Sequence, residues 1–183
     1  PIVMIRVEAA LRAKHLHEEL RSRYDFLRDT VYTDELTGLR NRRFLLERLQ
    51  EEVEKAHRYD YPVSCVVLDV DELVADDDEL GPVSMDDLMA EIAMTLRNYS
   101  RTYDVLARYD GTLFAAILPH APLEDAIGYS DKILSEVEST TYCDPSFPTH
   151  ARLSVGIVTC QNGSAHAADF VLGEAMRGLL QAK

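Results

Sequence analysis

The sequence has few cysteines and scattered histidines, which argues against a disulfide framework and against a metal site built on thiolates or imidazoles. It contains three cysteines, an odd number, and no two of them have the spacing of metal ligands. Cys65 and Cys160 lie in apolar runs and are predicted to be reduced residues of the core. His15 and His17 are neighbours on an expected helix, but their spacing points them to different faces. We therefore predict no metal site and a cytoplasmic location.

Positive charge is also scarce. Lysine and arginine number 19 against 32 aspartates and glutamates, so the formal net charge is −13. Such a chain repels the phosphates of nucleic acids at long range, and nucleic acid is not an expected partner. An anionic ligand would have to be met by a local basic cluster. No apolar stretch is long enough to span a membrane, and the first residues do not form a signal peptide.

What is present suits a globular fold. Hydrophobic residues make up 46% of the 183 residues and charged residues 28%, which is enough for a normal core. The length fits one compact domain with an added segment. There is no internal repeat and no low-complexity stretch.

The N-terminal part, residues 6–30, has the periodicity of an amphipathic helix, with apolar residues at spacings of three or four, or their sums. Such a helix could lie on its own domain, or it could join two chains as a parallel coiled coil. Arg23 and Tyr24 break the apolar stripe. We expect residues 1–32 to form a linker or signalling helix, and a homodimer is one predicted assembly.

The rest of the chain alternates helical and strand patterns. Asp110-Gly111 is typical of a tight turn between two strands, and Asn41 and Ser84 are expected helix caps. The predicted order is helix 42–58, strand 63–70, helix 85–99, hairpin 105–118, helix 123–137, strand 151–159 and a terminal helix. This order predicts an α+β fold with helices packed on a largely antiparallel sheet.

Four segments in this order resemble the motifs of one family, the GGDEF domains. They are DELTGLRNRRF (34–44), VLDVD (67–71), RYDGTLF (108–114) and LSVGI (153–157). Gln181-Ala182-Lys183 also resembles the end of the family's last helix. The resemblance covers residues 33–183 and implies a nucleotidyl-cyclase-like (ferredoxin-like) layer, a mostly antiparallel sheet flanked by helices. The family makes cyclic di-GMP from two GTP molecules, one held by each subunit of a dimer. Residues 1–20 resemble, more weakly, the last strand and helix of a receiver domain.

The signature of the family is degenerate in this sequence. Asp110 stands in place of the first signature glycine, Thr112 in place of the acidic metal ligand, and Leu113 in place of the next glutamate; Gly111 and Phe114 are retained. The resemblance therefore implies that Mg²⁺ and GTP are poorly held and that the domain is not an enzyme. An acidic side chain about 4 Å from a phosphate charge is repelled by roughly 4 kcal/mol at an effective dielectric near 20.

Other positions agree with this interpretation. Val74 stands where the family usually has a phosphate-facing lysine, and Asp77 replaces an asparagine that contacts guanine. Asp86, at the second guanine contact, and Asp69, at the first metal position, are kept. Asp69 and Asp71 also fit a simpler interpretation as polar residues at the end of a strand. No cofactor is predicted.

The product-binding site of the family is retained in outline. Arg101-Thr102-Tyr103-Asp104 matches the family's Arg-x-x-Asp, and Lys132 matches a position that often supplies a second cation. An arginine fork can bind a guanine edge or a phosphate, and an aspartate can accept from guanine. The alternative is a surface Arg–Asp pair worth at most about 1 kcal/mol. Tyr103 could stack on a guanine or pack on its own domain.

Three functions follow as hypotheses. The predicted one is a catalytically inactive GGDEF domain that acts as a cyclic di-GMP receptor in a bacterial two-component signalling protein. A second is a dimerisation or protein-interaction module that binds no nucleotide and contacts another copy or other domains of the same protein. The third, which we expect least, is a residual diguanylate cyclase.

Overall fold

A computed structural model describes residue 14 and residues 31–75, 84–142, 149–161 and 167–183. Several predictions fall outside these residues: the helix over 6–30 apart from Lys14, both histidines of the pair His15 and His17, Asp77 and Cys143. Cys65 and Cys160 are free and buried, as expected.

The described core is a five-stranded sheet. Its order is β1-β3-β4-β2-β5, in which β1 is parallel to β3 and every other neighbouring pair is antiparallel. The strands are β1 (Arg40–Asn41), β2 (Val63–Ala75), β3 (Val105–Asp110), β4 (Leu113–Pro119) and β5 (Thr149–Cys160). This confirms the predicted α+β fold with a mostly antiparallel sheet.

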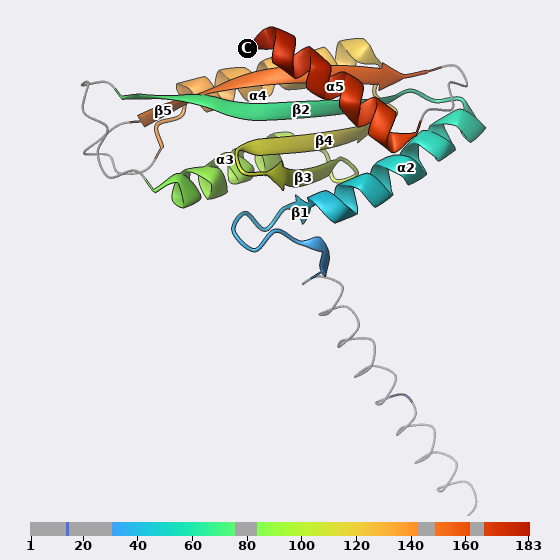
Figure 1. Cartoon of the computed structure of the whole chain (residues 1–183), viewed down its shortest axis with the longest axis horizontal. Coiled ribbons are helices and arrows are strands. Elements are labelled where there is room, and N and C mark those ends of the chain that lie inside the picture. The colour runs from blue at the N-terminus through green and yellow to red at the C-terminus, as the bar shows by residue number, and fades with distance from the viewer. Residues whose placement is uncertain (1–13, 15–30, 76–83, 143–148, 162–166) are drawn as a thin grey trace, which may run out of the picture.

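Helices cover both faces of the sheet (Figure 1). One face carries α2 (Arg42–Tyr59) and α5 (Ala168–Ala182), and the other carries α3 (Met85–Tyr99) and α4 (Leu123–Ser139). Two hydrophobic clusters result, one on each side. In β4 the side chains of Phe114 and Ala116 join the α3–α4 cluster, while Ala115 and Ile117 join the α2–α5 cluster. A strand buried on both faces reads as a continuous apolar run, which is why β4 was recognisable in the sequence.

The predicted helix caps are confirmed. The side chain of Asn41 accepts a hydrogen bond from the Phe44 amide at 3.1 Å, and Ser84 Oγ accepts one from the Asp87 amide at 3.4 Å. Both satisfy an amide that has no partner within its helix.

The strand expected over 63–70 is longer than predicted. β2 pairs with β5 as far as Ala75, opposite Thr149, after an irregularity between Val70 and Glu72. The prediction ended β2 at the first acidic residues, but pairing with β5 carries the backbone through them. β5 is longer for the same reason.

The turn of the hairpin lies one residue later than predicted. Asp110 pairs with Leu113, so Gly111 and Thr112 form the turn, and Gly111 has a φ of +44°. A register shift between Arg108 and Asp110 moves the turn along the chain. Thr112 consequently lies at the tip, close to Asp69 in the middle of β2.

Candidate functional site

The hairpin turn faces a carboxylate in the middle of β2. The Thr112 hydroxyl donates to Asp69 Oδ1 at 2.6 Å, and Lys183 Nζ donates to Asp69 Oδ2 at 2.5 Å. The same ammonium lies 2.7 Å from Asp71 Oδ1. Hydrogen bonds to the two carboxylates raise the pKa of Lys183. Each oxygen of Asp69 therefore already accepts from a neighbouring side chain.

The same hairpin is tied to the segment that carries the first motif. Arg108 Nε donates to the Gly111 carbonyl at 2.9 Å, and Arg108 NH1 lies 3.5 Å from Asp34 Oδ1. Burial acts to raise the pKa of Asp34, but hydrogen bonds from Thr37 and the charge of Arg108 outweigh it, so the pKa lies below the ordinary value. The motif around 34–39 thus positions the hairpin.

The remaining signature positions have different surroundings. Asp110 is exposed, Leu113 is half-buried, and Phe114 is fully buried in the core. Among the described residues, no group of three or more histidine, cysteine, aspartate or glutamate side chains is arranged to hold a metal ion. Asp86 is exposed in the first turn of α3 and takes no part in the hairpin cluster.

A second candidate site lies at the turn before β3. A hollow of about 360 Å³ is lined by Arg101, Asp104 and Lys132, the three residues predicted to bind cyclic di-GMP. Arg101 and Asp104 lie between α3 and β3, and Lys132 lies on α4. The structure brings these three residues together.

Asp104 is the least satisfied group in this hollow. Its Oδ2 accepts from the Arg101 amide at 2.7 Å, whereas its Oδ1 is buried and has no hydrogen-bond partner. Burial raises the pKa of Asp104, and the hydrogen bond and charge of Arg101 only partly offset this. A buried carboxylate oxygen without a donor costs free energy, so this turn is held at a cost in stability.

Two cations border the hollow with their charged groups accessible. Arg101 NH2 lies 4.0 Å from Asp125 Oδ2, and both side chains are about half exposed. Lys132 Nζ lies 4.9 Å from the centre of the Tyr99 ring. Tyr103 is 56% exposed and lies beside the Arg101 guanidinium, at 5.9 Å, so its side chain is available for stacking rather than buried in the core.

Sequence reasoning missed other residues that line this hollow, among them Asp125 and Tyr129. The Tyr129 hydroxyl shares a hydrogen bond of 2.9 Å with Ser100 Oγ, and burial raises the pKa of Tyr129 to about 12. Asp125, Tyr129 and Lys132 follow one another at helical spacings of four and three, so they share a face of α4. That spacing could have identified them once Lys132 was singled out.

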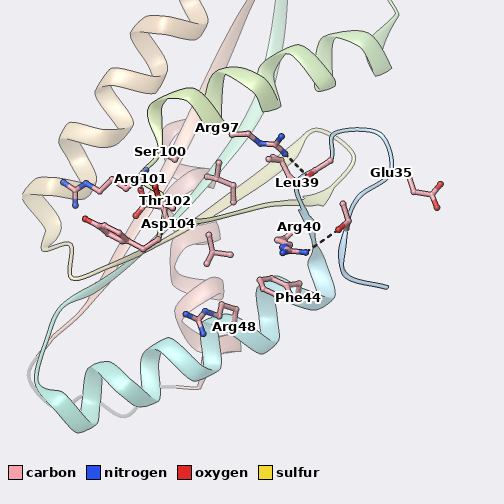
Figure 2. Close-up of a pocket in the computed structure, with 15 residues that line it drawn as sticks. Glu35, Leu39, Arg40, Phe44, Arg48, Arg97, Ser100, Arg101, Thr102 and Asp104 are labelled. Carbon is pink, nitrogen blue, oxygen red and sulfur yellow. Dashed lines mark hydrogen bonds between the residues drawn. The ribbon is translucent and has the colours of Figure 1, made fainter. Parts of the chain in front are cut away.

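A larger hollow of about 1070 Å³ lies on the other side of the same turn (Figure 2) and shares Arg101 and Asp104 with the smaller one. Arg40, Arg48 and Arg97 also line it. Arg97 points toward the 34–39 segment and donates to the Gly38 carbonyl at 2.8 Å. The turn at 101–104 therefore lies in the kind of basic cluster that a strongly acidic chain needs for an anionic ligand.

A mixed sheet with two helices on each face, and a glycine hairpin directed at Asp69 of β2, define the class as a cyclase-like fold. The family model described as "Diguanylate cyclase, GGDEF domain" matches residues 31–183. The chain belongs to the GGDEF domain family. No helix within the described ranges has both the length and the apolar character needed to cross a membrane.

Two curated relatives illustrate the similarity. The response regulator PleD of Caulobacter vibrioides is 30% identical over 184 residues, covering 97% of this chain and 39% of that protein. The diguanylate cyclase DgcP of Pseudomonas aeruginosa is 31% identical over 158 residues, covering 86% of this chain and 23% of that protein. The chain thus spans well under half the length of these relatives.

Solved structures share the fold. The diguanylate cyclase SiaD of Pseudomonas aeruginosa, in complex with its activator SiaC, aligns with a TM-score of 0.76 at 28% identity, covering 98% of this chain and 68% of that one. The coiled coil and GGDEF domain of DgcB from Caulobacter crescentus, in complex with c-di-GMP, aligns with a TM-score of 0.77 at 23% identity. That alignment covers 95% of this chain and 92% of the other.

Proposed function

We propose that this chain is a catalytically inactive GGDEF domain that binds cyclic di-GMP through Arg101, Asp104 and Lys132. One observation carries the proposal: Arg101, Asp104 and Lys132 line a single hollow, and the side chains of both cations are exposed. The buried thiols of Cys65 and Cys160 suit the cytoplasmic location that this function requires.

The side chains of the hollow suit both the guanine bases and the phosphates of the ligand. Guanine presents an N–H and an amino group on one edge, and a carboxylate can accept from both. The ligand's phosphates are matched by Arg101, whose planar fork binds phosphate in a bidentate manner, and by Lys132 as a point charge. The DgcB structure holds c-di-GMP, and DgcP is a diguanylate cyclase; both similarities support this class of ligand.

The residues at the hairpin support the proposed lack of cyclase activity. Mg²⁺ requires oxygen ligands in a near-octahedral shell, usually with one or two carboxylates and the substrate phosphates. The residues around the turn do not fit that requirement, because Thr112 and Lys183 already donate to both oxygens of Asp69. The exposed Asp110 adds negative charge where a triphosphate would approach.

Titration calorimetry with cyclic di-GMP tests the receptor proposal. We expect saturable binding, and weaker binding of cyclic di-AMP, because adenine lacks the N1–H that guanine would donate to the Asp104 carboxylate. Sodium chloride should weaken the binding through screening of Arg101 and Lys132. An absence of heat at millimolar cyclic di-GMP would contradict the proposal.

A turnover assay tests inactivity separately. With GTP and either Mg²⁺ or Mn²⁺, we expect no cyclic di-GMP above the level of a reaction without protein, since the carboxylate site is incomplete. Product is separated by chromatography, and the diguanylate cyclase DgcP serves as the positive control. Clear turnover would make the chain a working cyclase, whatever the outcome of the calorimetry.

A second candidate function is a protein-interaction module that assembles with another copy or with other domains. Leu123 and Ile127 lie one helical turn apart on α4, and both are more than 40% exposed. The residues that follow them in the chain, Glu124 and Gly128, line the Arg101 hollow. A stable dimer in sedimentation, together with no heat from cyclic di-GMP, would favour this function.

A further inference from the structure

The Lys183 side chain joins the end of α5 to the middle of β2 through two carboxylates at once. Its ammonium lies 2.5 Å from Asp69 Oδ2 and 2.7 Å from Asp71 Oδ1. The Thr112 hydroxyl donates to the other oxygen of Asp69 at 2.6 Å. The carboxylate pair therefore has a cation and a hydroxyl as partners, contributed by two distant parts of the chain.

The packing of α5 sets the position of this lysine. Gly156 of β5 lies against the backbone of Leu179, and Val67 of β2 pairs with Gly156. Lys183 follows Leu179 by four residues, so both lie on the same face of the helix. Asp69 follows Val67 by two residues and points to the same face of the sheet. The ammonium reaches the carboxylates because helix and strand are already in contact one turn earlier.

The carboxylates are more enclosed than those of an ordinary surface ion pair. The side chains of Asp69 and Asp71 are 13% and 25% exposed, and that of Lys183 is 38% exposed. Two carboxylates that share one site repel each other and favour binding of a cation. A hard divalent cation is a common solution in proteins, and here an ammonium from the same chain supplies the positive charge.

We propose that Lys183 is the resident cation of the Asp69–Asp71 pair, standing in for a metal ion and fastening α5 to β2. Divalent cations then find no free carboxylate at the hairpin. This role depends on the contacts of Lys183 alone and is independent of ligand binding at Arg101 and Asp104.

A mutant cycle tests the charge contact. Lys183→Met keeps the length of the side chain and removes its charge, and we expect it to lower the midpoint of thermal unfolding by about 2–4 °C at neutral pH and low salt. In the background Asp69→Asn/Asp71→Asn, the same substitution should have no effect. Arg177→Met is the matched control, because it removes one exposed positive charge from the same helix; its effect should be identical in both backgrounds.

Electron paramagnetic resonance measures the binding of Mn²⁺ and so tests whether the Lys183 ammonium takes the place of a metal ion. We expect the unsubstituted chain to bind Mn²⁺ no better than Asp69→Asn/Asp71→Asn does. Lys183→Met should bind it tighter by about tenfold or more, since an adjacent positive charge is lost, and Mn²⁺ should restore its unfolding midpoint. The inference would be overturned if Lys183→Met left the unfolding midpoint unchanged, or if it lowered the midpoint equally in both backgrounds. Equal Mn²⁺ binding with and without Lys183 would also overturn it. Equal Mn²⁺ binding would also remove the reason given above for inactivity at the hairpin, whereas GTP turnover itself is measured separately and does not test the role of Lys183.

Discussion

Replacing Gly156 with alanine is expected to destabilise the domain by about 3 kcal/mol or more, because the new methyl group overlaps the backbone of α5. A Cβ atom at this position would overlap the Ala175 carbonyl oxygen and lie 2.5 Å from the Leu179 amide nitrogen. These are backbone atoms of a buried helix, and they cannot rotate away. The helix would have to shift as a body, which opens the cluster between α5 and the sheet. Denaturant unfolding monitored by circular dichroism measures the loss.

Two other glycines provide the controls for this prediction. Gly128 and Gly173 lie inside α4 and α5, and a Cβ atom on either meets nothing within 4 Å. Alanine is favoured over glycine within a helix by about 0.5–1 kcal/mol, so both substitutions should leave stability unchanged or raise it. If Gly156→Ala unfolds at the same denaturant concentration as Gly173→Ala, the close approach of α5 to β5 is wrong.

The elements that could be predicted from the sequence are those whose signal is local. The periodicity of α2, the side chain of Asn41 at its start and the apolar run of β4 each depend on residues that are neighbours in the chain. Hydrophobic burial imposes such patterns wherever an element has a buried face, so they are visible before any partner is known.

The features that were missed depend on distant partners. β1 has two residues, Arg40 and Asn41, and forms only through pairing with β3. The end of β2 is polar, and its extension to Ala75 depends on hydrogen bonds with β5, far along the chain. No local pattern reports a contact of this kind.

The candidate site likewise has residues that could be identified from the sequence and contacts that only the structure shows. The resemblance to the family brought Arg101, Asp104 and Lys132 together, but it could not show that one oxygen of Asp104 lacks a donor. That property depends on how α4 and Tyr129 bury the turn. The contact between Lys183 and Asp69 spans 114 residues, and nothing in either segment indicates it alone.

Substituting Asp104 with asparagine is expected to separate binding from stability. The amide would place donors opposite the donors of guanine, so affinity for cyclic di-GMP should fall about tenfold to a hundredfold. Without ligand, the variant should be at least as stable as the unsubstituted chain, because burial raises the pKa of Asp104 and the charged form is disfavoured in the native state. At neutral pH that cost is fully present, and it lessens as the pH falls through the raised pKa, so removing the charge removes the cost. Calorimetry and thermal unfolding of the same samples measure both effects.

Two further measurements complete this test: the dependence of affinity on pH, and the affinity of a control variant in which a second carboxylate, Asp125, is replaced. In the unsubstituted chain, affinity should weaken as the pH falls through the raised pKa of Asp104, since the protonated carboxyl accepts less well; the affinity of Asp104→Asn should not follow that change. Asp125→Asn is the matched control. It removes a carboxylate 4.0 Å from the Arg101 guanidinium, which competes with a phosphate for that side chain, so its affinity should be equal or tighter. If Asp104→Asn binds normally, or if it loses stability without ligand, Asp104 holds the turn in shape and does not bind the guanine edge.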